Sequence, residues 1–305
     1  MILVTGGTGF VGQALIRQLV AQGKAVRTLL RPSQSSPNLP RGIPVEVAVS
    51  SLNDERSLLA ALKGVDTIFH LAGSERIGSK ADLTGVDIAG TRTLVQTAVQ
   101  AKVKRIFYLS HLGADRASAF ALLKAKAIAE HFIIKSGVNY TIFRSGPIYG
   151  PGDQFTTALA KLLRMSPGFF LMPGDGNTLL QPIWIEDLIT CLLLSLDDPQ
   201  TLNQTFSIGG AEYYSFREIV EILLQKLSLK RFLVSIQPPY LRLIGLFMEQ
   251  FMPRFPVSIF WLDYLAVDRT CALDILPRLF GLMPVRFSQN LDYLSTQENA
   301  TGLKL

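Results

Sequence analysis

A glycine-rich turn close to the start of the chain constrains the fold more than any other feature. Gly6, Gly9 and Gly12 recur at three-residue intervals. They follow the apolar run 2–5 and lead into residues 10–22, whose apolar side chains repeat at three- and four-residue steps. A strand, a glycine turn and a helix in this order are typical of the first βαβ unit of a fold that binds a dinucleotide.

Each glycine of the turn has a separate expected role. Gly6 permits the tight turn, Gly9 lets the backbone approach a pyrophosphate, and Gly12 lets the helix pack closely on the strand. The helix N-terminus then offers free N–H groups and the positive end of its dipole to the phosphates. A glycine-rich turn without a ligand is the alternative. The predicted phosphate loop contains Gly6, Thr8, Gly9, Phe10, Val11 and Gly12.

Strands and helices are expected to alternate through the first half of the chain. Apolar runs predict strands at 2–5, 25–30, 45–49, 67–72, 105–110 and 139–144. Helical periodicity predicts helices at 10–22, 53–63, 88–101 and 120–136. This alternation implies right-handed crossovers and a parallel sheet that is covered on both faces. We therefore predict an α/β fold with a Rossmann-like, doubly wound parallel sheet.

The pattern loosens after the strand at 139–144. A loop rich in Gly and Pro is expected at 146–153, and a strand followed by a helix returns at 181–196. Asp187 is expected to cap that helix, because aspartate is a preferred N-cap residue. We therefore predict two domains. The dinucleotide-binding domain contains 1–145 and about 181–210, and a smaller C-terminal cap region for a substrate contains 146–180 and 211–305.

The end of the second strand bears on which dinucleotide is bound. Sites specific for NAD usually place an acidic residue there, to bind the ribose 2′-hydroxyl. Here the chain has Leu30, Arg31 and Pro32 with no acid nearby. The guanidinium of Arg31 can pair with a 2′-phosphate, with Arg27 assisting. NADP(H) is therefore favoured over NAD(H), the alternative being a solvated Arg31.

Composition excludes several other classes of function. The net charge of +6 comes from scattered Lys and Arg, without the basic and aromatic clusters typical of nucleic-acid binding. Cys191 and Cys271 give no disulfide framework, and three histidines form no ligand pattern, so no metal site is expected. No secretory signal or membrane-spanning run is evident, which favours the cytoplasm.

A mean hydropathy of +0.29 is high for a soluble protein and directs attention to residues 239–265. This segment is apolar and aromatic, with Arg242 and Arg254 among the few charges that interrupt it. One interpretation is that it lines the cap and its core. The other is that it contacts a membrane surface or a partner protein, since large apolar patches are rarely exposed without a function.

Several motifs together resemble the short-chain dehydrogenase/reductase superfamily, in its atypical or extended branch with the NAD-dependent epimerases and dehydratases. The resemblance covers nearly the whole chain and implies that Leu71, Ala72 and Gly73 pass beside the cofactor. The motifs are Thr5–Gly12, Asp66–Gly73, Gly90-Thr91, Tyr108–Ser110, Tyr149–Asp153 and Gln181–Asp187.

Within that branch, the chain is similar to the nucleotide-binding accessory subunits of respiratory complex I and their free-standing bacterial relatives. The matching residues are Leu29–Pro32, Ser110 with Leu112–Asp115, and Lys124 with Ala127 and Glu130. The resemblance implies an NADPH that is held as a structural ligand and not turned over.

The sequence departs from the catalytic pattern of the superfamily on the long helix. Active members carry Tyr-x-x-x-Lys on the long helix, a spacing that puts both side chains on one face. The resemblance assigns Lys124 to the lysine, which contacts the ribose, and Phe120 to the tyrosine. A phenyl ring cannot exchange a proton. Ser110, His111 and Tyr149 are the remaining candidates for proton transfer, although each also fits a purely structural role.

Two functions follow from these observations. In the first, the protein holds NADP(H) in a binding, assembly or redox-sensing role, and docks on a larger complex at the periphery of a membrane. In the second, it is an NADP-dependent reductase or a sugar-nucleotide epimerase or dehydratase with a non-standard proton carrier. Whether the chain is an enzyme stays open on the sequence alone, and the sequence names no substrate.

Overall fold

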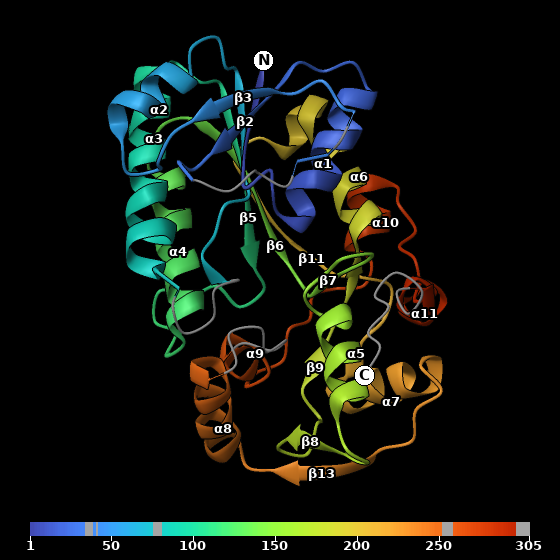
Figure 1. Cartoon of the computed structure of the whole chain (residues 1–305). Coiled ribbons are helices and arrows are strands. Elements are labelled where there is room, and N and C mark those ends of the chain that lie inside the picture. Colours follow the sequence, from blue (N-terminus) through green and yellow to red (C-terminus); the bar gives the residue numbers. More distant parts are fainter. Residues whose placement is uncertain (34–38, 41, 76–80, 252–258, 297–305) are drawn as a thin grey trace. The chain divides into compact units, whose positions relative to one another are not determined.

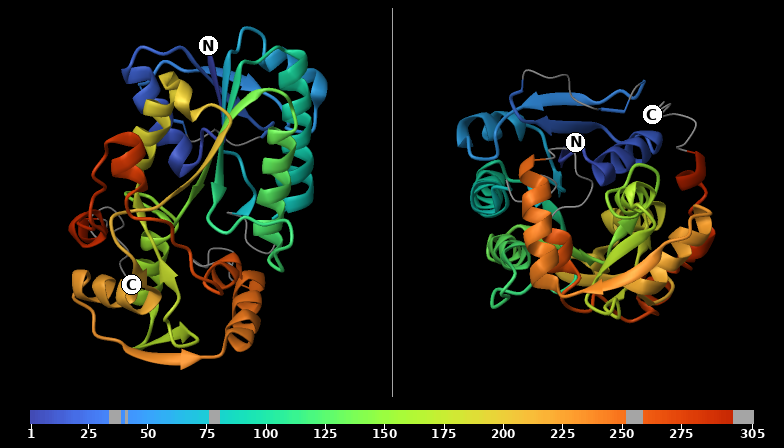
Figure 2. Two further views of the ribbon diagram at one scale, coloured as in Figure 1. Left: turned by 180° about the vertical axis from the view of Figure 1, so that it is seen from behind. Right: turned by 60° about the horizontal axis from the view of Figure 1, so that its bottom comes forward.

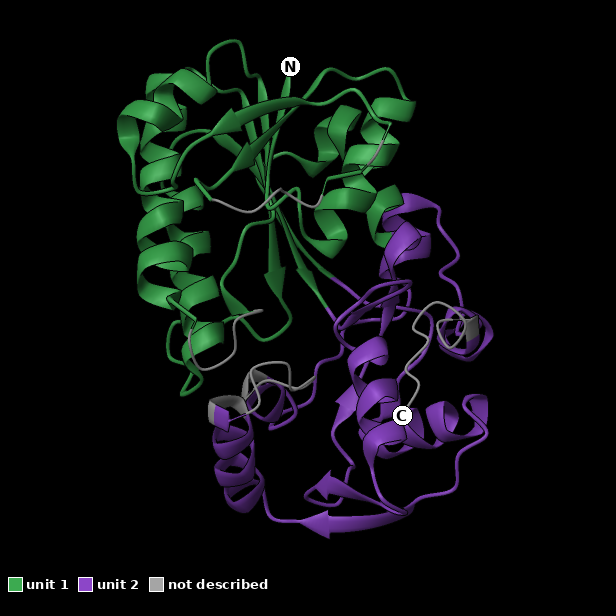
Figure 3. Cartoon of the chain, in the orientation of Figure 1, with its two compact units in different colours: residues 1–75, 81–145, 188–207 green, residues 76–80, 146–187, 208–305 purple. Residues whose placement is uncertain are grey.

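The structure is a computed structural model that describes residues 1–33, 39–40, 42–75, 81–251 and 259–296. The chain divides into two compact units (Figure 3). Unit 1 contains Met1–Glu75, Ala81–Ser145 and Leu188–Ser207. Unit 2 contains the described residues of Gly146–Asp187 and Ile208–Leu305. The later segment of unit 1 is therefore shorter than the expected 181–210.

Unit 1 is built on a seven-stranded sheet with the strand order β11-β6-β5-β4-β1-β2-β3. The strands are β1 (Ile2–Thr5), β2 (Val26–Leu30), β3 (Glu46–Val49), β4 (Thr67–His70), β5 (Arg105–His111), β6 (Asn139–Ser145) and β11 (Gln204–Ile208). The pairs from β3 to β6 are parallel. The α/β fold with a doubly wound parallel sheet is confirmed.

Helices cover both faces of this sheet (Figure 1). One face carries α2 (Glu55–Ala61), α3 (Thr91–Gln100) and α4 (Ala121–Ile134), and the other carries α1 (Phe10–Ala21) and the unit 1 part of α6 (Ile185–Asp197). Helices α3 and α4 lie side by side in Figures 1 and 2. A π-helical segment, Leu83–Gly90, leads directly into α3.

The sheet is stable because its strands are apolar on both faces. Leu3, Ile68 and Ile106 are neighbours in register on β1, β4 and β5, and none of them is exposed. The next row, Val4, Phe69 and Phe107, points to the other face and is equally buried, as a sheet covered by helices on both faces requires. The sequence predicted β4 as far as residue 72, but the strand ends at His70 and residues 71–73 belong to no helix or strand.

Unit 2 combines helices with three pairs of short strands (Figures 1 and 2). Strand β8 (Phe169–Pro173) pairs in parallel with β13 (Phe232–Ile236), and β7 (Ile148–Tyr149) with β10 (Ile183–Trp184). Strand β9 (Leu179–Leu180) is antiparallel to β12 (Tyr214–Ser215). The helices are α5 (Thr156–Met165), α7 (Phe216–Lys226), α8 (Pro238–Phe251), α9 (Ile259–Tyr264), α10 (Ile275–Phe280) and α11 (Tyr293–Thr296). Single 3₁₀ turns occur at Pro199–Thr201 in unit 1 and Phe287–Gln289 in unit 2.

Local capping explains where α7 begins but not where α6 begins. Ser215 and Glu218 form a reciprocal capping box at the start of α7. Asp187 is not the N-cap residue that the sequence predicted, because α6 begins two residues earlier, at Ile185. Its carboxylate instead accepts a hydrogen bond of 2.9 Å from the backbone N–H of Val285, within unit 2.

None of the described helices is long and apolar enough to cross a membrane.

Candidate functional site

The glycine turn between β1 and α1 has the backbone geometry that its sequence predicts. Gly6 has a φ of +74°, and a Cβ there would lie 2.7 Å from the carbonyl carbon of Leu71. A Cβ on Gly12 would lie 2.2 Å from the carbonyl oxygen of Gly6, so α1 approaches the turn closely. The N–H of Gly9 donates to the same oxygen at 2.9 Å. Only glycine fits at Gly6 and Gly12 without a backbone shift.

The start of α1 leaves its first backbone N–H groups available. Gly9 is the N-cap residue and has no side chain that could cap them. The first turn of α1, which begins with Phe10 and Val11, carries no acidic side chain. Free N–H groups, a positive dipole end and the missing Cβ atoms together fit the pyrophosphate of a dinucleotide. Thr8 lies in the same turn, where its carbonyl accepts from the Gln13 amide at 3.0 Å.

Two hydrogen bonds of one histidine, His70, help to hold the end of β4 beside the glycine turn. His70 is buried, with Nδ1 2.7 Å from Thr5 Oγ1 and Nε2 2.9 Å from Thr91 Oγ1. The N–H of Leu71 donates to the carbonyl of Thr5, and the N–H of Ala72 donates to Thr5 Oγ1. The structure thus brings Leu71 and Ala72 beside the glycine turn, whereas Gly73 lies against Glu75 and Lys126.

Burial lowers the pKa of His70 to about 3, and the nearby Lys126 charge adds to this effect. The unfolded chain therefore takes up a proton at higher pH than the folded one, so stability falls as the pH drops from about 6.5 towards 3. We expect a loss of about 1.6 kcal/mol between pH 6.5 and about pH 5 from this group.

Urea unfolding at both pH values measures this loss. Replacing His70→Gln should flatten the pH dependence in that window. The matched variant His131→Gln, at a partly exposed histidine of α4, should retain it. Equal pH dependence in the two variants would show that His70 titrates normally.

The arginines near the end of β2 have different environments. Arg31 is exposed directly after β2, as a 2′-phosphate contact requires. Arg27 is not available to assist it: its guanidinium pairs with Glu46 at 2.8 Å and donates to the carbonyl oxygens of Ala61 and Lys63. The prediction that Arg27 shares a phosphate contact is therefore wrong, because hydrogen bonds at the opposite end of β2 occupy its donors.

A buried lysine that the sequence analysis did not single out lies at the centre of a charged cluster in unit 1. The side chain of Lys126 is 3% exposed. Its Nζ lies 3.3 Å from Asp87 Oδ1, 3.5 Å from Glu75 Oε2 and 5.8 Å from the ring centroid of Tyr108. The other oxygen of Asp87 accepts hydrogen bonds from the backbone and hydroxyl of Ser74, at 3.1 and 2.6 Å.

The ionisation of this cluster follows from its composition. Burial opposes the charge on Lys126, but Glu75, Tyr108 and Asp87 outweigh it and raise the pKa of the lysine well above its usual value. Burial likewise works against the charge of Glu75, yet Lys126 and His111 hold the pKa of that carboxyl below its usual range. Lys126 and Glu75 are therefore both charged at neutral pH.

Lys124 lies on the opposite face of α4 and is exposed. It borders a shallow hollow with Leu83, Ile88 and Ile128, away from the charged cluster. The structure therefore does not bring Lys124 together with Ser110 and His111, and Lys126 occupies the buried position instead. A helical-wheel signal was available: Leu122, Lys126, Ala129 and Ile133 repeat at steps of four, three and four on the buried face of α4.

Ser110 and His111 end β5 beside this cluster. Ser110 is buried and His111 is partly exposed, with Nε2 3.7 Å from Glu75 Oε1. Glu75 thus connects His111 to Lys126. Among the described residues, Ser110 Oγ and the hydroxyl of Tyr108 have no hydrogen-bond partner although both are buried. Such groups are uncommon in native interiors and mark a place where a polar ligand group fits.

Tyr149 belongs to unit 2. Its ring packs edge-on against Trp184 and Phe287, with centroid distances of 5.2 and 4.9 Å. Burial raises the pKa of its hydroxyl, so this phenol stays protonated. The structure places Tyr149 in the aromatic core of unit 2, and the groups around Lys126 are all in unit 1.

Comparison with known proteins agrees with this geometry. A family model described as NAD(P)H-binding matches residues 6–159, just over half of the chain. Sterol demethylase protein B of Methylococcus capsulatus is 29% identical over 277 residues, which are 83% of this chain and 82% of that protein.

A second relative is NADH dehydrogenase (ubiquinone) 1 alpha subcomplex subunit 9, mitochondrial, of Arabidopsis thaliana. It is 27% identical over 232 residues, 72% of this chain but only 56% of that protein. The structure of MoeE5 in complex with UDP-glucose and NAD is similar in fold, with a TM-score of 0.75, 18% identity and coverage of 98% of this chain and 99% of that one. The chain thus belongs to the NAD(P)H-binding family, and it shares the fold of a structure that was solved with NAD.

Proposed function

We propose that the protein holds NADP(H) without turning it over, in a binding, assembly or redox-sensing role. The observation that carries this proposal is the pair of positions on the buried face of α4. Lys126 is buried within the charged cluster, and four residues earlier stands Leu122, which is 6% exposed. In the superfamily pattern that position holds the tyrosine that exchanges a proton with the substrate, and leucine has no proton to exchange.

If Lys124 is instead aligned with the lysine of the superfamily pattern, the tyrosine is missing as well. Phe120 is the N-cap residue of α4 and has no hydroxyl. Neither register therefore supplies a phenol on the long helix. The residues that we assign to the cofactor are those of the glycine turn, Arg31 for a 2′-phosphate, and Leu71–Gly73. We assign the ribose contact to Lys126 in place of Lys124, because its ammonium is on the buried face with Tyr108 and Asp87.

A gain-of-function variant tests whether the missing phenol limits the chemistry. We expect the wild type to oxidise no NADPH with a panel of aldehydes and ketones, and Leu122→Tyr to gain slow turnover. The matched control Leu122→Phe adds the ring without the hydroxyl and should stay inactive, and Phe120→Tyr tests the other register. Turnover by the wild type that Ser110→Ala abolishes would contradict the proposal.

That last result would support a second function, an NADP-dependent reductase or sugar-nucleotide epimerase or dehydratase. The observation in its favour is the buried and unpartnered hydroxyl of Ser110, next to His111 and Glu75. In this alternative, Ser110 polarises a carbonyl and His111 moves a proton. Tyr149 is a weaker candidate, because its hydroxyl is enclosed in the core of unit 2.

We further propose that residues 239–265 contact a partner complex or a membrane surface, which would place the protein in the cytoplasm at the periphery of a membrane complex. Exposed apolar side chains of α8 support this proposal: Leu243, Phe247 and Phe251 are each more than 60% exposed. The plant relative supports the assembly role, because its name assigns it to a subcomplex of NADH dehydrogenase.

A further inference from the structure

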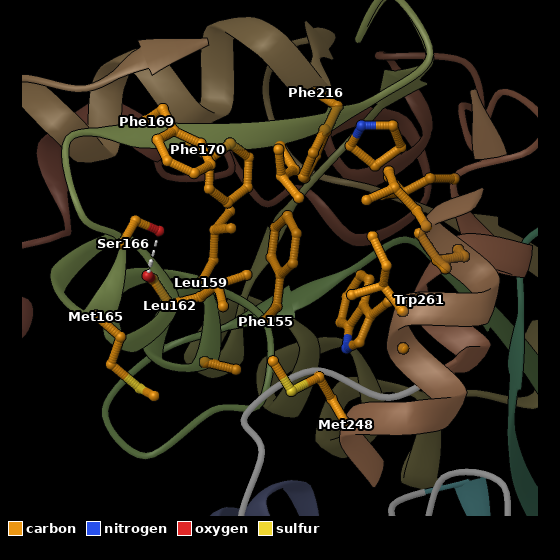
Figure 4. A pocket seen from close by; sticks show the side chains of 18 of the residues that line it. Phe155, Leu159, Leu162, Met165, Ser166, Phe169, Phe170, Phe216, Met248 and Trp261 are labelled. Atoms are coloured by element: carbon orange, nitrogen blue, oxygen red, sulfur yellow. Dashed lines mark hydrogen bonds between the residues drawn. The ribbon is translucent and has the colours of Figure 1, made fainter. Parts of the chain in front are cut away.

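Unit 2 contains a cavity of about 330 Å³ that is separate from the glycine turn and from the charged cluster (Figure 4). All of its lining residues belong to unit 2, on α5, β8, α8, α9 and the start of α7. The rings of Phe155 and Trp261 stack at 4.9 Å in its wall, and Phe170, Leu159 and Met248 complete much of the remaining surface. The volume is within the usual range for small-molecule sites.

The lining side chains restrict what the cavity accepts. No Asp, Glu, Lys, Arg or His is among the described residues that line it. The hydroxyl of Ser166 already donates to the carbonyl of Leu162 at 2.8 Å, as Figure 4 shows. A phosphate, a carboxylate or a sugar would therefore leave its hydration shell without gaining charged partners, which costs several kcal/mol. The occupant must be uncharged and apolar over most of its surface.

Helix α8 has one apolar stripe in the wall of the cavity and another that is exposed. Leu241, Ile244, Gly245 and Met248 line the cavity at helical spacing. Leu243 and Phe247 lie on other faces of the helix and are 66% and 61% exposed. Large apolar side chains that are exposed on a helix indicate contact with an apolar phase or ligand.

We propose that the cavity binds one molecule of an uncharged lipid, with its hydrocarbon body between α5 and α8. The inference is independent of the cofactor assignment, because it uses no residue of unit 1. The two chemical sources of such a hydrocarbon body are a fused-ring lipid and a long-chain lipid.

Energy transfer from Trp261 tests this proposal on the full chain. The sequence contains two tryptophans, and Trp184→Phe leaves Trp261 in the cavity wall as the single donor. The probes are dehydroergosterol, a fluorescent fused-ring sterol, and parinaryl alcohol, a fluorescent straight chain. We expect saturable transfer with one probe per chain, and the probe that saturates identifies the source. Saturation by neither probe overturns the proposal, as does displacement of a bound probe by UDP-glucose.

A cavity-filling variant separates binding in the cavity from adsorption to the surface. A Cβ built on Gly245 meets only Leu262 Cδ1, at 4.0 Å, so Gly245→Phe projects a ring into the cavity and also replaces a poor helix former. We expect at least tenfold weaker probe binding. The matched control Leu243→Phe adds the same ring to the exposed stripe and should bind normally.

Equal affinity of Gly245→Phe and the parent would place the probe outside the cavity and overturn the proposal. If Gly245→Phe does not fold, Ala158→Phe fills the same cavity from α5 and should weaken binding by the same factor.

Discussion

Replacing Gly6 by alanine is expected to weaken NADPH binding by at least about a hundredfold, or about 2.7 kcal/mol. The new Cβ would lie 2.7 Å from the carbonyl carbon and oxygen of Leu71 and 2.8 Å from the N of Ala72. These are backbone atoms and cannot rotate away. The turn must therefore shift, and the N–H groups at the start of α1 lose the position from which they meet the pyrophosphate. Equilibrium titration of the folded variant measures the loss.

Gly64 is a matched control for this substitution. Its φ of +76° is close to the +74° of Gly6, so alanine suffers the same backbone strain at both positions. A Cβ on Gly64 would meet nothing within 4 Å. Gly64→Ala should therefore lose about 1 kcal/mol of stability and bind NADPH normally. Equal affinity of the two variants would show that the close approach at Gly6 does not shape the site.

Replacing Lys126 by methionine is expected to destabilise the protein by about 3–5 kcal/mol. The ammonium is the cation between Asp87 and Glu75, and the side chain of Asp87 is fully buried. Removing it leaves buried negative charge without a partner, which costs far more than the net contribution of the original pair. The free energy of unfolding in urea at neutral pH measures this effect.

The control is Lys124→Met, the same change two residues earlier on the exposed face of α4. It should alter stability by no more than about 0.5 kcal/mol. The double variant Lys126→Met with Asp87→Asn should recover part of the loss, since it removes one of the two stranded charges. If both single variants are equally stable, Lys126 is not the buried partner of these carboxylates.

Much of unit 1 was predictable because its strands are short, apolar runs that end at turn residues. β1 is continuous and buried, and the spacing of the glycines after it requires the tight turn and the close helix that the structure shows. The end of β4 was placed too late, because Leu71 and Ala72 continue the apolar run while their N–H groups bond to Thr5. Composition does not show where a strand turns away from its sheet.

The buried lysine was harder to find because α4 is rich in alanine on every side. Ala125, Ala127 and Ala129 are all buried, so alanine does not mark the inner face of this helix. Resemblance then favoured Lys124, although the steps from Leu122 to Ile133 place Lys126 inside. Its carboxylate partners, Glu75 and Asp87, lie far from Lys126 in the sequence, and only the fold brings them to this lysine.

The pairing of the short strands in unit 2 could not be predicted from the sequence, for a different reason. Strands of two residues, such as β7 and β10, are too short to show an alternation of apolar and polar side chains. The cavity is likewise a property of packing. The apolar character of 239–265 was evident, but its division between a cavity wall and an exposed stripe depends on how α8 lies beside α5 and β8.

Calorimetric titration of the wild type with NADPH and, separately, with NADH tests the central claim most directly. We predict saturable binding of one NADPH per chain, and affinity for NADH that is at least about tenfold, or 1.4 kcal/mol, weaker because Arg31 gains no 2′-phosphate. Equal affinities would contradict the role of Arg31 alone. Binding of neither nucleotide by the folded protein would contradict the account of the glycine turn as a dinucleotide site.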